Sequence, residues 1–66
     1  MSVYKVTEII GTSTTSWEDA AMTAITTAKG TLRDLRIAEV VEQDIELSGD
    51  APLFRVKLAV SPKYEG

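Results

Sequence analysis

The stretch TLRDLRIAEV, residues 31–40, decides the fold of this 66-residue chain, because it joins a helix-like segment to a long strand-like one. Upstream of it, small and apolar residues from Trp17 to Ala28 recur at helical spacing and predict a helix over residues 16–29. Downstream, apolar and β-branched residues predict a strand over residues 36–47. The stretch therefore marks the passage from one helix to a strand.

Two further strands complete the pattern. Alternating residues predict a first strand over residues 3–10, ended by Gly11, and a third strand over residues 53–60. Residues 48–52, SGDAP, form the turn between the second and third strands. We expect a single α+β domain over residues 1–66 with the order β-α-β-β. Its sheet has three antiparallel strands in the order first, third, second, and the helix covers one face.

The second strand is long for so small a domain. At about 3.3 Å per residue it spans about 40 Å, whereas the radius of gyration expected for a compact chain of this length is about 11 Å. We therefore expect that it is not wholly paired within its own subunit and that part of it pairs or packs with a neighbour. The chain has no Cys and no His, which leaves oligomerisation, or a hard cation held by carboxylates, as the means of stabilising a small core.

Composition excludes several classes of function. The net charge is −3 with acidic and basic residues interleaved, so the basic stripe of a nucleic-acid-binding protein is missing. No apolar run reaches the roughly 20 residues of a membrane span. Residues 1–5 show no signal peptide, which makes the cytoplasm the default location, with export without a classical signal as the alternative. Without His or Cys no nucleophile–base pair is apparent, and we expect a non-enzymatic protein.

Several segments, in this order and spacing, resemble the dodecin family, whose members are small β-α-β-β proteins that assemble as hollow dodecamers. The resemblance covers almost the whole chain and is carried by YKVTEIIGTS (4–13), TSWEDA (15–20), TLRDLR (31–36), EV (39–40) and VKL (56–58). It implies a homododecamer as the functional form.

The positions that contact the ligand in flavin-binding dodecins are changed. In those proteins a Trp that stacks on the flavin ring occupies the position of Ile37, and a Gln that hydrogen-bonds the ring edge occupies that of Arg55. An aliphatic side chain cannot supply aromatic stacking, worth about 0.5–1.5 kcal/mol beyond its area, and Arg offers no acceptor. The resemblance therefore implies that flavin is not the ligand. A flavin-storage dodecin with an altered pocket is the alternative.

The calcium dodecin branch of the family is more similar to this chain, through GTS (11–13), TSWE (15–18) and VEQD (41–44). This resemblance implies calcium binding without flavin. Calcium takes six to eight oxygen ligands at about 2.3–2.6 Å, and the hydroxyl-rich start of the helix offers oxygens from Thr12, Ser13, Ser16 and Glu18. Glu18 has a competing role as a helix cap, in a Thr15–Glu18 capping box; Ser16 and Asp19 form a second such box.

Other residues have simpler interpretations. We expect Trp17 to pack in the core or at a subunit interface, and Arg55 to pair with Glu39, Glu42 or Asp44 on the neighbouring strand. The carboxylates of Glu42, Asp44 and Glu46 fall on one strand face. That face is either solvated beside Arg and Lys, or lines a cage interior or pore that gathers cations. A structural shell with no dedicated ligand is a third class of function.

Overall fold

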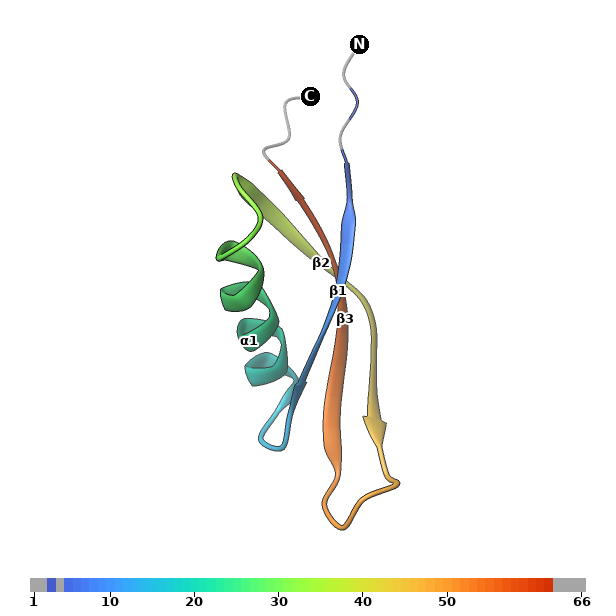
Figure 1. Ribbon diagram of the computed structural model, residues 1–66. Coiled ribbons are helices and arrows are strands. Elements are labelled where there is room, and N and C mark those ends of the chain that lie inside the picture. The colour runs from blue at the N-terminus through green and yellow to red at the C-terminus, as the bar shows by residue number, and fades with distance from the viewer. Residues whose placement is uncertain (1–2, 4, 63–66) are drawn as a thin grey trace.

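The computed structural model describes Val3 and residues 5–62. Its elements are β1 (Thr7–Ser13), α1 (Trp17–Lys29), β2 (Leu35–Glu46) and β3 (Leu53–Pro62) (Figure 1). The predicted α+β fold with β-α-β-β order is confirmed.

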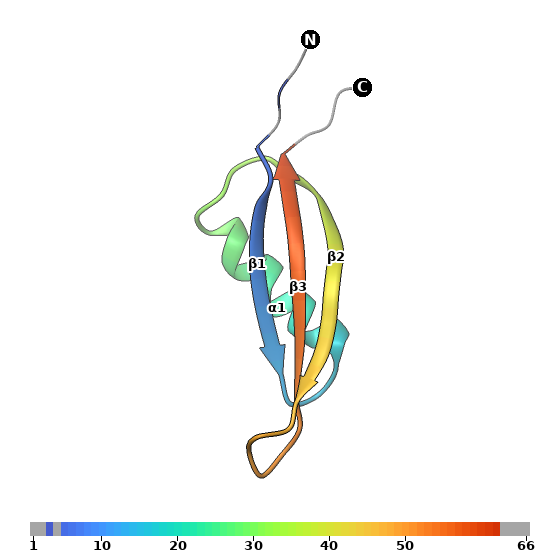
Figure 2. The same cartoon turned by 90° about the vertical axis from the view of Figure 1, so that its right-hand side faces the viewer.

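The sheet is antiparallel throughout and has the predicted order β1-β3-β2. The β2–β3 hairpin places β3 on one side of β2, and β1 then pairs with the other edge of β3. The helix α1 lies on one face of the sheet and crosses the strands obliquely (Figure 2). The sheet therefore has a helix-covered face and an outer face without a second layer.

A small core lies between α1 and the central strand. Val56, Leu58 and Val60 alternate along β3 and point at the helix, where they are at most 2% exposed. The helix meets them with Ala20 and Ala24, whose short side chains allow close approach. Ile9, Trp17 and Ile25 are among the partly buried residues at its margin. The predicted apolar face of the helix is thus the face that packs.

The predicted end of the first strand at Gly11 is wrong. The strand β1 continues through Gly11 to Ser13 and begins only at Thr7, so Val3, Lys5 and Val6 lie before it, and Tyr4 is outside the described residues. Gly11 is a point of close approach between β1 and α1. A Cβ added there would lie 2.1 Å from the carbonyl oxygen of Ala20. Gly11 therefore allows the two backbones to lie close together and does not mark a turn of the chain.

The expectation that the second strand could not be paired along its length within its own chain is also wrong. The strand β2 pairs with β3 from Leu35 to Glu46, with irregularities between Leu35 and Ile37 and between Val40 and Glu42. This is possible because β3 extends to Pro62, past the predicted end at residue 60. The molecule is correspondingly elongated, with principal extents of 49 × 20 × 14 Å and a radius of gyration of 13.3 Å.

The helix α1 ends without a glycine in the left-handed conformation that often closes helices. At the C-terminal end, Gly30 stays in the right-handed helical region, and its N–H donates to the carbonyls of Thr27 and Ala28. The turn into β2 is made at Asp34, whose φ of 58° is the one positive value among the described non-glycine residues. Asp is among the residues that tolerate this conformation, since its side chain is short and polar.

Candidate functional site

The start of α1 is organised by serine hydroxyls. Ser16 is the N-cap residue, and its Oγ accepts a 3.0 Å hydrogen bond from the backbone N–H of Asp19. Ser13, at the end of β1, is buried, and its Oγ accepts from the N–H groups of Thr15 at 2.9 Å and Ser16 at 3.4 Å. The second of the two predicted capping boxes, Ser16 with Asp19, is therefore the one that contributes the cap.

Asp19 joins this network through its carboxylate. Its Oδ2 accepts a 2.7 Å hydrogen bond from the hydroxyl of Ser13, and the residue is exposed. Glu18 precedes it in the first helical turn and is exposed as well. The first helical turn thus carries two acidic residues, of which Asp19 is joined to the hydroxyl of Ser13. Asp19 was not among the predicted ligands, although its place in the Ser16–Asp19 capping pattern indicated that it lies there.

The structure brings together only part of the predicted oxygen cluster. Ser13 pairs with Phe54 on the helix-covered face of the sheet, while Thr12 pairs with Arg55 and lies on the outer face. The side chain of Thr12 is therefore separated from those of Ser13 and Ser16 by the strand itself. Within the described residues no group of three or more Asp, Glu, His or Cys side chains is placed to hold a metal ion. A cation at the helix start would need hydroxyl, carbonyl or water oxygens in addition to the two carboxylates.

The outer face of the sheet carries a strong ion pair. Arg55 on β3 donates from Nε to Oδ1 of Asp44 at 2.6 Å and from Nη2 to Oδ2 at 2.8 Å, and Asp44 lies directly opposite it on β2. Its Nη1 is 4.0 Å from a carboxylate oxygen of Glu46. Of the three predicted partners for Arg55, Asp44 is thus the one that is bound.

This ion pair shifts the pKa values of both Asp44 and Arg55. The hydrogen bonds from Arg55 hold the pKa of the Asp44 carboxyl below its ordinary value. The hydrogen bonds to Asp44 and its negative charge raise the pKa of the Arg55 guanidinium, with smaller contributions from Glu46 and Glu42. Both groups are therefore charged at neutral pH, and the donors on the side of Arg55 that faces Asp44 are engaged.

Ile37 lies on the same outer face as Arg55. It is opposite Ser61 in register and is 47% exposed. The two positions predicted to correspond to flavin contacts therefore share one surface, on which one side chain is aliphatic and the other is held by a carboxylate. Neither side chain offers an aromatic plane or a free amide edge.

Trp17 connects the helix start to the hairpin strands. Its indole N–H donates a 3.1 Å hydrogen bond to the carbonyl of Asp44, and its ring meets that of Phe54 edge-on, with centroids 5.2 Å apart. Its ring packs at the margin of the core, and packing in the core was one of the two environments predicted for Trp17. Asp44 is thereby held on both sides: its backbone by Trp17 and its carboxylate by Arg55.

Comparison with known proteins agrees with this geometry. The sequence matches the family described as Dodecin over residues 3–65. It is 50% identical over 64 residues to a Mycobacterium tuberculosis protein named calcium dodecin, covering 96% of this chain and 90% of that protein. A crystal structure of calcium dodecin from M. tuberculosis, described as a calcium-chelating antigen with a novel calcium-binding site, superposes with a TM-score of 0.83 at 49% identity, covering 97% of this chain and 93% of the other.

A second solved structure, a dodecin from Streptomyces davaonensis, is more distant in sequence. It superposes with a TM-score of 0.82 at 32% identity, covering 97% of this chain and 96% of the other. No helix within the described residues is long and apolar enough to cross a membrane. The fold, the family match over residues 3–65 and the identity to its relatives lead to one conclusion: this chain belongs to the dodecin family.

Proposed function

We propose that this chain is a non-enzymatic dodecin that binds calcium rather than flavin and acts as a subunit of a hollow homododecamer, as a store or buffer of the cation. Ser13, Ser16 and Glu18 remain the candidate ligands, and Asp19 joins them. Thr12, whose side chain lies across the strand, becomes an outlying member of the set.

One observation carries the proposal. The first turn of α1 carries Glu18 and Asp19, and the Asp19 carboxylate accepts a hydrogen bond from the Ser13 hydroxyl, in a chain that is 50% identical to a protein named calcium dodecin. The helix N-terminus bears a partial positive charge and by itself repels a cation. Calcium binding at this place therefore depends on the two carboxylates, which reverse the local sign of the charge.

Calcium titration calorimetry on chelator-stripped protein tests the proposal. We expect saturable heat, together with a melting temperature that rises with calcium concentration, because a ligand bound to the folded state alone stabilises it. Absence of heat and an unchanged melting temperature would contradict calcium binding.

Matched variants locate the site. Because Glu18→Gln removes one charged ligand, we expect it to weaken calcium binding about tenfold or more, a loss of about 1.4 kcal/mol or more. Asp50→Asn, which removes a carboxylate from the exposed hairpin loop, is the control and should leave the affinity unchanged. Equal affinities of the two variants would remove Glu18 from the candidate ligands while leaving calcium binding itself intact.

The flavin-storage alternative has its own test. The bidentate contact with Asp44 occupies Arg55, and Ile37 supplies no ring, so we expect riboflavin fluorescence to stay unquenched when protein is added. Quenching, or a yellow protein after purification, would favour the alternative.

A further inference from the structure

Basic side chains gather at one end of the molecule. The strands β1 and β2 begin there, β3 ends there, and α1 reaches it with its last turn (Figure 1). Most of the basic residues that the structure describes belong to this end: Lys5, Lys29, Arg33 and Arg36. We refer to these residues as the basic end. The other described basic residues, Arg55 and Lys57, lie on the outer face opposite Asp44 and Glu42.

A pocket with an apolar lining lies within the basic end, between the last turns of α1 and the start of β2. Its volume is about 200 Å³. The apolar lining comes from the helix and from the sheet: Ile25, Leu35, Ile37, Ala38 and Val60. Lys29 lines the pocket from α1 and Arg36 lines it from β2, whereas none of the described acidic residues does. The pocket therefore combines a hydrocarbon surface with two positive charges.

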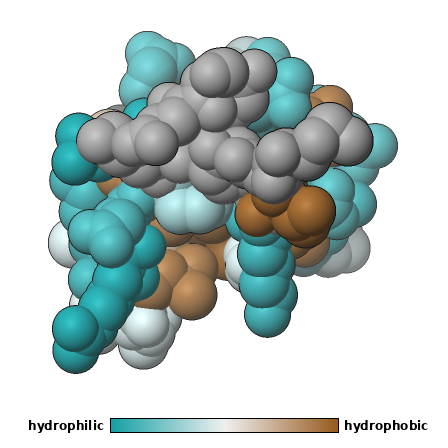
Figure 3. Space-filling view, turned by 90° about the horizontal axis from the view of Figure 1, so that it is seen from above, coloured by the Kyte–Doolittle hydropathy of each residue, from teal (hydrophilic) through white to brown (hydrophobic). Residues whose placement is uncertain are grey.

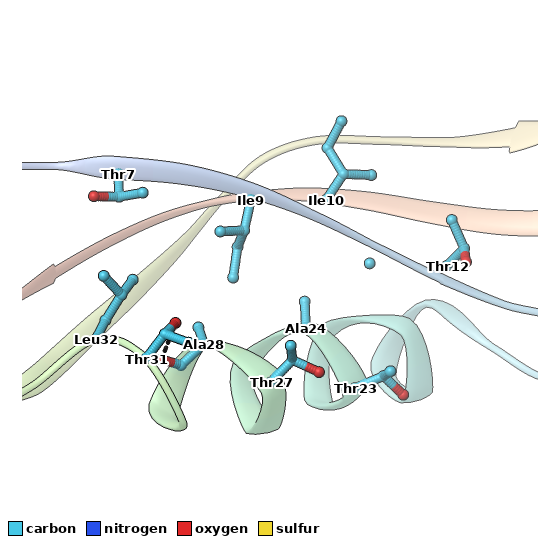
Figure 4. A pocket seen from close by; sticks show the side chains of 11 residues that line it. Thr7, Ile9, Ile10, Thr12, Thr23, Ala24, Thr27, Ala28, Thr31 and Leu32 are labelled. Atoms are coloured by element: carbon cyan, nitrogen blue, oxygen red, sulfur yellow. Dashed lines mark hydrogen bonds between the residues drawn. The ribbon is translucent and has the colours of Figure 1, made fainter.

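A smaller pocket of the same kind lies beside the first. Its volume is about 140 Å³, it shares Leu35 and Val60 with the first pocket, and Lys5 and Arg33 line it without any described acidic residue. Leu32 also lines it, and the same side chain points toward β1 in a larger groove of about 580 Å³ between β1 and α1, which no described charged residue lines (Figure 4). In the view onto this end of the molecule, apolar surface shows between projecting polar side chains (Figure 3). The two small pockets, and not the larger groove, therefore join apolar surface to positive charge.

The carboxylates of the described chain do not pair with the basic end. The ion pairs among the described residues all involve Arg55 on the outer face. Asp34, which follows Arg33 in the chain, lines neither pocket. Lys29 lies in the last turn of α1, where a cation is favourable next to the helix C-terminus, but this reason does not apply to Arg36 on β2. An anion in the first pocket would therefore meet two positive charges that no described carboxylate neutralises.

The volume of the pocket limits the ligand to a small one. Sites for drug-sized ligands measure about 300–1,000 Å³, so a pocket of about 200 Å³ suits a ligand smaller than a nucleotide or a flavin. A carboxylate is a small anionic group, and a guanidinium can bind it through two parallel hydrogen bonds. A short hydrocarbon chain attached to that carboxylate would cover the apolar lining. Volume, lining and charge are therefore all met by one class of molecule, an amphipathic carboxylate.

We propose that the pocket between α1 and β2 binds a free amphipathic carboxylate, a fatty-acid-like anion with a short chain. Arg36 and Lys29 donate to the carboxylate, and the chain packs on Ile25, Leu35 and Val60. The calcium candidates lie at the opposite end of α1, at its first turn, so the two sites are separate. Failure of calcium binding therefore leaves this proposal standing, and the reverse is also true.

Three matched ligands test the chemistry of the pocket. Equilibrium dialysis against the wild-type protein, in the oligomeric state in which it is purified, should show saturable binding of octanoate. Octanol has the same chain without the charge, and acetate has the charge without the chain, so each should bind at least about tenfold more weakly. Octanoate binding should also weaken as salt is added, because salt screens exposed charges. Absence of octanoate binding, or octanol or acetate binding as tightly as octanoate, would overturn the proposal.

Glutamine variants locate the site. Lys29→Gln and Arg36→Gln should each weaken octanoate binding about tenfold, because each removes one charged donor. Lys57→Gln, on the outer face, is the control and should leave the affinity unchanged. Circular dichroism and light scattering verify that each variant is folded and has the wild-type mass, and Arg36→Lys replaces Arg36→Gln if the latter is not folded. Wild-type affinity in both folded pocket variants would overturn the proposal, and so would a larger loss in Arg33→Gln, which alters only the neighbouring pocket.

Vesicles distinguish a free carboxylate from a membrane surface as the anion that the basic end recognises. The wild-type protein should not sediment with phosphatidylglycerol vesicles in the buffer in which it binds octanoate. Sedimentation with these vesicles without saturable octanoate binding would assign the basic end to a lipid surface and overturn the proposal.

Discussion

Replacing Gly11 by Ala should destabilise the protein strongly, because β1 and α1 meet backbone to backbone at this residue. The added Cβ would lie 2.1 Å from the carbonyl oxygen of Ala20 and 2.8 Å from the Cβ of Ala24. Ordinary van der Waals contact between these atoms begins at about 3.5 Å, so the helix must shift by more than about 1 Å. Neither obstacle is the end of a flexible side chain, which rules out a local rearrangement.

The expected magnitude follows from the rigidity of the obstacle. Overpacking a core usually costs about 1–3 kcal/mol, and contact with helix backbone places Gly11→Ala near the upper end, at about 3 kcal/mol. Domains of this length have a total free energy of unfolding of about 3–10 kcal/mol. With a urea m-value of about 1 kcal/mol/M for so small a chain, the unfolding midpoint should fall by about 3 M.

Urea denaturation at a fixed protomer concentration is the appropriate assay, since the stability of an oligomer depends on concentration. Gly49→Ala is the matched control, because its Cβ would meet no atom closer than 3.9 Å and no described glycine has a positive φ. We expect it to be neutral or more stable by up to about 1 kcal/mol, through a less flexible unfolded chain. If both variants unfold at the same urea concentration, the close approach of β1 to α1 does not restrict position 11 to glycine.

Two further substitutions examine the helix cap and the ion pair. Ser16→Ala removes the acceptor for the N–H of Asp19 and should lower the free energy of unfolding by about 1 kcal/mol. Thr14→Ala is the control, at an exposed position in the same loop. Equal losses of stability in the two variants would contradict the role of Ser16 as the helix cap. Asp44→Asn should be less stable than the wild type at pH 7, and this difference should vanish in strong acid. The pKa of Asp44 is lowered in the folded state, so its stabilisation is complete above the unfolded pKa of about 3.9 and is lost as the pH falls through the folded pKa. Urea midpoints of both proteins at neutral and strongly acidic pH measure this, and a gap that does not narrow would argue against the pairing with Arg55.

The fold was predictable because its signals are local and consistent. The helix from Trp17 to Lys29 followed from the spacing of its alanines, and the strand order followed from one hairpin and one crossover. The end of β1 was not predictable from local sequence. A glycine in a strand is an equally good sign of termination and of close approach by another backbone, and only the position of α1 distinguishes the two.

That boundary also affects the candidate site. If Gly11 ended the strand, Thr12 and Ser13 would belong to one loop and could share a ligand. Because the strand continues, they alternate onto opposite faces of the sheet. The partner of Arg55 could not be predicted from local sequence either, because Glu39, Glu42 and Asp44 all lie on the outer face. The bulge between Val40 and Glu42 sets the register that places Asp44 directly opposite Arg55.

The strand order has a consequence for how the chain folds. The central strand β3 is the last element in the sequence, and it pairs residues as distant as Thr7 and Val60. During synthesis β1, α1 and β2 therefore emerge before the strand with which both β1 and β2 pair. Contacts of such long sequence separation slow folding and prolong the exposure of unpaired strand edges. The sheet can therefore form only after β3 has been synthesised, because β1 and β2 each pair with β3 and not with one another.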